Sequence, residues 1–304
     1  MTDAPERPPD VAPGPIVEVD DPDDPRLDLY RDLNDPAGRV RLDGEQSIFV
    51  VEGRLAVDRL LTSGYTVRSL LVDGHQLTAA GDLVAAYRAR GAPVFVGSRA
   101  LVAGTVGFAL HRGVVAVAER PAPLDPDRLL AHATGTPVRV GAPQLLVVLE
   151  GLNDHENIGA LFRNAAAFAV AGVLLDPTCG DPLYRRSIRV SVGHVLHVPF
   201  ARLVPWPAGL DQVRAAGFVV AALAPRPAAD SGIPAVGLGE LKARMSGPGH
   251  LVGLALLVGA EGPGLTERAL AASDVVVSIP MAAGVDSLNV ATAAAIALHA
   301  IAGS

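Results

Sequence analysis

The chain has 304 residues, of which half are hydrophobic, with a single cysteine and few aromatic side chains. This length allows two domains with sizeable cores, and the lone Cys179 excludes an intrachain disulfide and fits a reducing compartment. The scarcity of aromatic residues argues against base-stacking platforms as the main means of binding nucleic acid. No segment approaches the roughly 20 apolar residues that span a bilayer, and the N-terminus has no apolar signal core. We therefore expect a soluble, cytoplasmic protein.

The net charge of −7 is concentrated at the start of the chain. Residues 1–26 hold eight acidic residues against Arg7 and Arg26, which gives −6 and leaves −1 for everything after Arg26. Local basic clusters can therefore matter in the near-neutral remainder. Residues 1–25 are rich in Pro and Asp and have almost no periodic apolar pattern, so we expect a disordered acidic tail there.

Residues 26–118 alternate strand-like and helix-like segments, the pattern of a small α/β domain. A short helix and a turn follow the tail, and strands are predicted at 48–51, 67–72, 93–96 and 114–117. One helix begins at 52–54 and another spans 83–90. The apolar positions of the first helix fit one broad face and are Leu55, Val57, Leu60 and Leu61. Residues 119–143 are Pro-rich and broken, which predicts a linker with a short helix in it.

Residues 144–304 predict a larger α/β domain around a sheet of about six strands. The strand at 145–149 has no polar break, as is usual for central strands of parallel sheets. Further strands are predicted at 173–176, 195–198, 219–223, 251–259 and 275–279. A loop and helix at 153–168 and helices at 184–192, 209–216 and 290–302 complete the pattern.

The strands at 251–259 and 275–279 each run into a loop that contains glycine. The first loop is Gly259-Ala260-Glu261-Gly262-Pro263-Gly264, and the second is Pro280-Met281-Ala282-Ala283-Gly284. Glycine lets the backbone approach a ligand closely, and loops at the ends of parallel strands are where such sheets bind cofactors. These two loops predict a cofactor pocket.

The first polar cluster surrounds Asn157 and Arg163. If a helix starts near Asn157, then Asn157, Ala160, Arg163 and Asn164 share a face. A guanidinium and two amides in the first turns of a helix that follows a strand can bind an anion or a hydroxyl group. The alternative is ordinary N-capping by Asp154 or Asn157, with Arg163 on a solvated face.

Two further clusters lie in the last fifty residues. Glu261 lies between Gly259 and Gly264, where an ordinary turn is the alternative. The loop is neither a Walker loop nor a GxGxxG motif, and the absence of a following Lys-Ser/Thr pair argues against a P-loop. In Ser287-Leu288-Asn289, helix capping explains Ser287 but leaves Asn289 unexplained inside the first turn.

A basic cluster lies on the helix predicted at 184–192. Its members Arg185, Arg186 and Arg189 are candidates for contacts with RNA phosphates, and a solvated helix face is the alternative. His194 and His197 flank a predicted strand. Since no Cys, Asp or His spacing suggests zinc, we expect no metal site.

Taken together, the three polar clusters resemble, in order and spacing, the motifs of the SpoU (TrmH-like) branch of the SPOUT RNA methyltransferases. The first motif is Asn157-Ile158-Gly159-Ala160 with Arg163-Asn164-Ala165, and the second is Val258-Gly259-Ala260-Glu261-Gly262 with Gly264-Leu265. The third is Ile279-Pro280-Met281 followed by Ser287-Leu288-Asn289-Val290. The resemblance covers residues 145–303 well. It covers 45–118 more loosely, through Phe49-Val50-Val51-Glu52-Gly53 and His111-Arg112-Gly113-Val114-Val115-Ala116, which look like the family's N-terminal substrate-binding domain.

This resemblance implies an α/β fold whose C-terminal part forms a trefoil knot, and a homodimer formed through the C-terminal domain. It also implies S-adenosylmethionine as cofactor and methyl transfer to a ribose 2′-hydroxyl of rRNA or tRNA. By position, the cofactor-binding residues are Gly259, Glu261, Ile279, Met281, Leu288 and Asn289. Arg163 corresponds to the family's catalytic arginine, and the supporting polar residues are Asn157, Glu261, Ser287 and Asn289.

The chemistry fits these assignments. The methyl group of a sulfonium is already activated, so the enzyme must align a 2′-oxygen with it and help to remove a proton. Guanidinium groups stay protonated in proteins, so we expect Arg163 to hold the neighbouring phosphate or to stabilise the developing alkoxide. The main alternative is a catalytically silent RNA-binding protein on the same fold, against which the intact polar residues argue. A dinucleotide-dependent oxidoreductase is excluded because the first βα turn lacks the required glycines.

Overall fold

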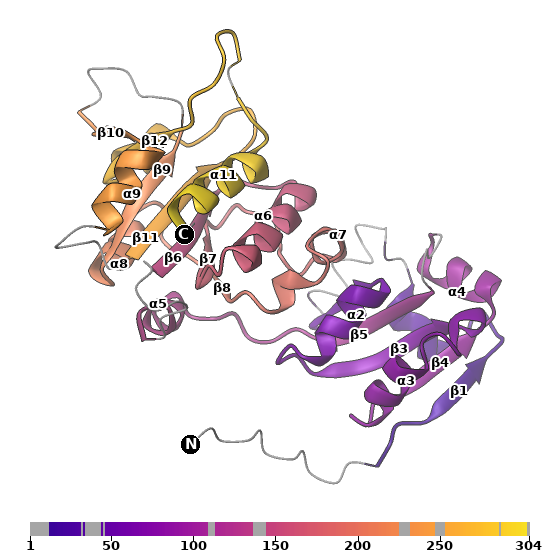
Figure 1. Cartoon of the computed structure of the whole chain (residues 1–304). Coiled ribbons are helices and arrows are strands. Elements are labelled where there is room, and N and C mark those ends of the chain that lie inside the picture. The colour runs from indigo at the N-terminus through magenta and orange to yellow at the C-terminus, as the bar shows by residue number, and fades with distance from the viewer. Residues whose placement is uncertain are drawn as a thin grey trace. The chain divides into compact units, whose positions relative to one another are not determined.

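The computed structural model describes residues 12–31, 33, 44, 46–108, 113–135, 144–224, 232–246, 253–285 and 287–302. The chain divides into two compact units. The first comprises Met1–Pro121 and Leu183–Arg189, and the second comprises Ala122–Pro182 and Val190–Ser304. Each unit is built around a β-sheet of its own (Figure 1). Within the described ranges, every helix is too short or too polar to cross a bilayer.

The sheet of the first unit is mixed and has the strand order β1-β4-β3-β5-β2. Its strands are β1 (Ile16–Val19), β2 (Ile48–Glu52), β3 (Val67–Asp73), β4 (Val94–Gly97) and β5 (Val114–Glu119). Strand β4 runs parallel to both β1 and β3, whereas β5 is antiparallel to both β3 and β2.

Short helices cover this sheet. They are η1 (Pro25–Tyr30), α2 (Arg54–Leu61), η3 (Gly74–Gln76), α3 (Gly81–Arg88) and α4 (Arg99–Val106). Helices α2 and α3 pack together, and the buried Tyr87 hydroxyl donates to the Val57 carbonyl across that contact at 3.0 Å. Helices η1 and α4 contribute Leu27, Tyr30 and Val102 to a hydrophobic cluster with the strands.

The expected disordered tail at 1–25 is wrong from residue 16 onward, and residues 1–11 lie outside the described part. Ile16–Val19 form the parallel edge strand β1, in register with Val94 to Gly97 of β4. Only Val19 of the four residues is buried, so the apolar pattern was too weak to reveal the strand. Leu55 was also misplaced: it is 52% exposed, while its neighbours Ala56 and Val57 are buried.

The sheet of the second unit has seven strands in the order β10-β12-β9-β11-β6-β7-β8 within the described residues. They are β6 (Gln144–Glu150), β7 (Gly172–Leu175), β8 (Phe200–Arg202), β9 (Phe218–Leu223), β10 (Ala235–Gly237), β11 (Gly253–Gly259) and β12 (Val275–Ser278). All of their pairings are parallel. Strand β11 lies between β6 and β9, and its register pairs Gly259 with Glu150. The carboxyl ends of β6 and β11 are therefore level with each other.

The helices that follow residue 122 are α5 (Pro126–Gly135), α6 (His155–Ala167), α7 (Arg185–Val190), η4 (His194–Leu196), α8 (Leu210–Ala215), α9 (Leu238–Ser246), α10 (Glu267–Ala271) and α11 (Val290–Ala302). Helices α5, α8 and α10 share one hydrophobic core with the strands. Helices α6 and α11 lie side by side (Figure 1), and the Asn164 amide donates to the Ala291 carbonyl between them at 2.8 Å.

One expectation for this region needs correction. The strand predicted at 195–198 is the 3-10 turn η4, and the strand β8 begins later, at Phe200. Val195 and Leu196 are both buried, which a helical turn achieves as well as a strand does, so the short apolar run was ambiguous. The short helix expected within 119–143 is the ten-residue helix α5, and residues 136–143 lie outside the described part.

Candidate functional site

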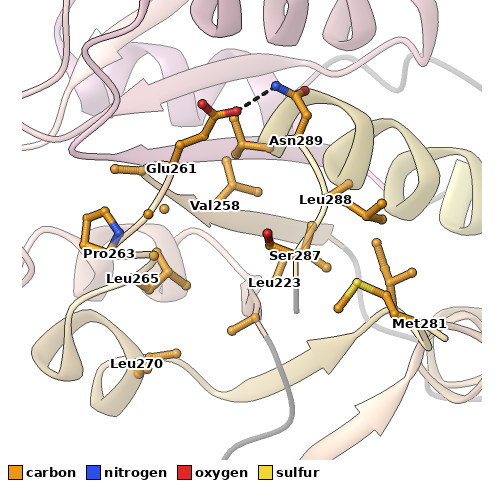
Figure 2. Close-up of a pocket in the computed structure, with 18 residues that line it drawn as sticks. Leu223, Val258, Glu261, Pro263, Leu265, Leu270, Met281, Ser287, Leu288 and Asn289 are labelled. Carbon is orange, nitrogen blue, oxygen red and sulfur yellow. Dashed lines mark hydrogen bonds between the residues drawn. The ribbon is translucent and has the colours of Figure 1, made fainter. Parts of the chain in front are cut away.

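A cavity of about 750 Å³ opens at the carboxyl ends of β9, β11 and β12. Such ends are where parallel sheets bind ligands, and the volume suits a small organic cofactor. Its lining comes from three segments: the end of β9, the stretch from β11 to α10, and the stretch from β12 to the start of α11. In Figure 2 the loop residues Pro263 and Leu265 lie across the cavity from Met281.

The loop after β11 is a tight turn that requires glycine at its first position. Ala260 and Gly264 form an isolated antiparallel bridge, in which the Gly264 amide donates to the Ala260 carbonyl at 3.0 Å. A Cβ atom on Gly259 would lie 2.4 Å from the backbone carbon of Gly264. The absence of a side chain at Gly259 lets the two sides of the turn approach each other, and both Gly259 and Gly264 line the cavity.

Asn289 is the centre of the polar network at the cavity. Its Nδ2 donates to Glu261 Oε1 at 2.7 Å and to Asn157 Oδ1 at 2.8 Å, and Figure 2 shows the first of these bonds. Its Oδ1 accepts from the amides of Ala291 and Thr292 at 3.0 and 3.2 Å. Asn289 therefore caps α11 and at the same time fixes the Glu261 carboxylate. Capping belongs to Asn289 and not to Ser287, because the helix starts at Val290.

Helix α6 supplies the first cluster, and the structure divides it. Asp154 caps the helix by accepting from the Glu156 amide at 2.7 Å, as the capping alternative expected. Asn157 is buried and, like Asn164, bonds toward α11. Arg163 is exposed on α6, has no hydrogen-bond or ion-pair partner among the described residues, and does not line the cavity. The predicted common face therefore holds for the two amides and not for the guanidinium.

All six residues predicted to bind a cofactor, together with Ser287, line this one cavity. Met281 and Leu288 are apolar and more than a third exposed, so both are accessible to a ligand. The prediction missed Leu223 and Ala224, which line the cavity from the end of β9. Nothing in the sequence placed β9 beside β11 and β12, because that strand order depends on long-range pairing.

The basic cluster on α7 and the carboxylate that holds it, Glu52, both belong to the first unit. Glu52 is 5% exposed and pairs with Arg185 at 2.5 Å and with Arg189 at 2.7 Å. The Arg185 side chain is itself only 11% exposed, and its guanidinium lies 4.2 Å from the centre of the Phe108 ring. Arg186 is exposed. Contact of these three arginines with RNA stays a prediction, and for Arg185 it would require breaking a buried ion pair.

Neither a reactive thiol nor a metal site is found among the described residues. Burial raises the pKa of the Cys179 thiol to about 12, so the thiol is neutral at physiological pH and a poor nucleophile. Across the described ranges, no group of three or more His, Cys, Asp or Glu side chains could hold a metal ion.

Comparison with known proteins agrees with this geometry. Residues 144–299, about half of the chain, match the model of the SpoU rRNA Methylase family. The chain belongs to this family. It is 43% identical over 284 residues to an uncharacterized tRNA/rRNA methyltransferase of Mycobacterium bovis, covering 93% of this chain and 91% of that protein.

Solved structures resemble this chain over more than nine tenths of its length. The SpoU methyltransferase AviRb from Streptomyces viridochromogenes, in complex with the cofactor AdoMet, has a TM-score of 0.70 at 26% identity over 91% of this chain and 97% of that chain. A structure described as an RNA 2′-O ribose methyltransferase has a TM-score of 0.69 at 23% identity over 94% and 97% of the two chains.

Family membership confirms the resemblance drawn from the three motifs, and the mixed α/β fold is the expected one. The protein is a methyltransferase of a family that acts on RNA. SpoU methyltransferases use S-adenosylmethionine, so the expected cofactor is confirmed as well.

Proposed function

We propose that this SpoU methyltransferase transfers the methyl group of S-adenosylmethionine to a ribose 2′-hydroxyl of tRNA or rRNA. The observation that carries the proposal is the cavity whose polar edge is the Glu261, Asn289 and Asn157 network. The similar fold of an RNA 2′-O ribose methyltransferase supports the choice of the ribose as acceptor. The same polar residues argue against a silent RNA-binding protein, which would not need them.

The cavity suits S-adenosylmethionine by size and by chemistry. Gly259, Ile279 and Leu288 line it and would bind the cofactor largely through backbone groups. Met281 and Leu288 supply exposed apolar surface for the adenosine and methionine parts. Among the described residues, Glu261 has one hydrogen-bond partner, Asn289, and its carboxylate lies where it can face a positively charged ligand.

When bound, the cofactor supplies an activated methyl group on a sulfonium. The chain must hold the ribose 2′-oxygen in line with that group, exclude water and stabilise the oxygen as it loses its proton. Arg163 is the candidate for the last task. Its guanidinium is exposed and without a partner among the described residues, so it is available to a phosphate or an alkoxide. Ser287 lines the cavity and would contact the substrate or the cofactor.

We further propose that the active form is a homodimer joined through the second unit. Arg163 does not line the cavity of its own chain, so a second copy would bring it to the site. The neighbouring helix α11 exposes Ile296, an apolar side chain that such an interface would cover. A trefoil knot in the C-terminal part belongs to the same proposal. The insertion of β11 between β6 and β9 and the packing of α11 on α6 support it. In this proposal the first unit binds the RNA substrate.

Mapping of 2′-O-methyl groups tests the reaction. RNA from a strain that lacks the gene is compared with RNA from its parent by liquid chromatography of nucleosides and by site mapping. We expect one 2′-O-methylated nucleotide to disappear and to return with the wild-type gene but not with an Arg163→Ala variant. Loss of a base methylation, with all ribose methylation intact, would refute the proposed acceptor.

A further inference from the structure

Glu150 is a buried carboxylate that no motif of the family resemblance includes. It is the last residue of β6 and is 4% exposed. Its Oε1 accepts from the Trp206 indole nitrogen and from the Thr266 hydroxyl, both at 2.7 Å, and its Oε2 accepts from the Thr266 backbone amide at 2.8 Å. Burying a charged group is costly unless hydrogen bonds compensate, and here three donors do so.

These donors are unusual because none of them is a cation. No arginine, lysine or histidine pairs with Glu150 among the described residues. Glu52, the other deeply buried glutamate discussed above, is held by two arginines instead. A carboxylate held only by neutral donors depends on their positions, because loss of one donor leaves charge uncompensated. The hydrogen bonds to Glu150 therefore hold the Trp206 and Thr266 side chains in place, just as they hold the Glu150 carboxylate.

Thr266 connects Glu150 to the cavity. It caps α10 by accepting from the Ala269 amide at 3.2 Å, and it follows Gly264 and Leu265, two lining residues. The other end of the same loop is Gly259, which pairs in register with Glu150. Both ends of the loop that carries Glu261 are thus attached to one residue of the neighbouring strand, by the strand ladder on one side and by the Thr266 bonds on the other.

We propose that Glu150 is a positioning residue for the cofactor pocket: through Thr266 it holds the Gly259–Gly264 loop in the conformation that binds S-adenosylmethionine. Glu150 itself does not line the cavity. This inference rests on the proposed function, because it assumes that the cavity binds the cofactor. Glu150, at the carboxyl end of β6, would then affect the affinity for the cofactor without touching the cofactor itself.

The test measures the affinity of the full-length protein for S-adenosylhomocysteine by calorimetry, with thermal unfolding recorded in parallel. Glu150→Gln keeps the shape of the side chain but turns an amide toward one of the donors. We expect its Kd to rise about tenfold, the size of a lost charge-assisted hydrogen bond. Thr266→Val removes the hydroxyl from the other side and should raise the Kd similarly, whereas Thr266→Ser should stay within about twofold of wild type.

Asp274→Asn is the matched control. Asp274 accepts from the Val220 amide at 2.8 Å and pairs with Arg214 at 2.9 Å. It directly precedes β12 and therefore lies at the amino ends of the strands, away from the cavity at their carboxyl ends. The same carboxylate-to-amide change there should lower the unfolding temperature and leave the Kd unchanged. If Glu150 and Thr266 act through one contact, the double variant Glu150→Gln with Thr266→Val should bind no more weakly than the worse single variant.

A folded Glu150→Gln protein with wild-type affinity would overturn the inference, and so would fully additive effects in the double variant. If Glu150→Gln does not fold, the Thr266→Val and Thr266→Ser pair decides between the two outcomes alone. Failure of the wild-type protein to bind S-adenosylhomocysteine would instead count against the proposed use of the cavity. Methylation of a base would count against the proposed acceptor, and it would leave the result on Glu150 standing.

Discussion

Glu150 and Glu261 lie at the ends of neighbouring strands but in opposite environments. Glu150 ends β6, is 4% exposed and accepts three hydrogen bonds from neutral donors. Glu261 follows β11, is exposed, and accepts one hydrogen bond from the part of the chain that the structure describes, from Asn289. The first carboxylate has its acceptor capacity used within the protein, whereas the second keeps most of it for a ligand. The number of hydrogen bonds that each carboxylate accepts within the protein thus distinguishes Glu150, which supports the site, from Glu261, which belongs to it.

The arginines show the same contrast. Arg185 is nearly buried and pairs with Glu52, while Arg163 is exposed and unpartnered among the described residues. Sequence alone gave both residues a functional assignment, Arg163 through the first motif of the family resemblance and Arg185 as a member of the basic cluster on a predicted helix. The structure makes Arg163 the more available guanidinium for a negatively charged substrate.

The largest expected effect comes from adding a side chain at the start of the Gly259–Gly264 loop, which carries Glu261. Gly259→Val places side-chain atoms where the Gly264 backbone lies, because even a Cβ would approach it to 2.4 Å. We expect the affinity for S-adenosylhomocysteine to fall by at least about 100-fold in calorimetry. Gly237→Val is the control: Gly237 ends β10, has open space where a Cβ would lie and does not line the cavity, so binding should stay normal. Normal binding by Gly259→Val would show that the loop does not form the pocket.

Arg163→Lys tests the exposed one of the two arginines compared above, Arg163. It keeps the charge but loses the planar, bidentate donor group. We expect kcat to fall by about 100-fold, while the Kd for S-adenosylhomocysteine stays the same because the proposed partner of Arg163 is the RNA and not the cofactor. Arg128→Lys, at an exposed position of α5, should leave both quantities unchanged. Near-normal turnover by Arg163→Lys would refute the need for a guanidinium.

Truncation of each glutamate to alanine compares them directly. Glu150→Ala leaves the buried donors of Trp206 and Thr266 without an acceptor, so the free energy of unfolding should fall by about 2 kcal/mol. Glu261→Ala should change it by less than about 0.5 kcal/mol, because the site is exposed. Trp206 is the single tryptophan of the chain, so its fluorescence during urea denaturation reports the second unit. Equal losses for the two variants would remove the distinction between them.

Asn289→Asp has the smallest expected effect and separates capping from site chemistry. Aspartate keeps the acceptor for the Ala291 and Thr292 amides but loses the donor to Glu261 and adds a like charge beside it. We expect unfolding to change little and the Kd for S-adenosylhomocysteine to rise about tenfold. Asn289→Ala also loses the cap and should cost about 1 kcal/mol of stability. If Asn289→Asp binds as wild type does, the amide is only a cap.

The sequence predicted much of the site because its residues follow strands whose carboxyl ends meet in a parallel sheet. That rule, together with the motifs of the family resemblance, was enough to assign Gly259, Ile279 and Leu288 to one candidate pocket. Residues whose position depends on partners far away in the sequence could not be assigned in this way. Thr266 lies 116 residues from Glu150, and Arg185 lies 133 residues from Glu52, so neither pairing leaves a local signal.

The same reasoning explains the errors in the fold. Most long strands and helices were predicted because their apolar patterns extend over a whole face. Strand β1 was missed because it has four residues, of which one is buried, and it depends on its pairing with β4. The order of the larger sheet, with β11 inserted between β6 and β9, follows from long-range pairing that no local pattern encodes.

The central claim, that the methyl group goes to a ribose 2′-oxygen, can be tested with one assay. Wild-type protein is incubated with S-adenosylmethionine labelled in the methyl group and with RNA from a strain that lacks the gene, and the RNA is then hydrolysed with alkali. A 2′-O-methyl group blocks cleavage of the adjacent phosphodiester, so we predict that the label appears in alkali-resistant dinucleotides and is absent with Arg163→Ala. Label found in mononucleotides would show methylation of a base and would contradict the claim.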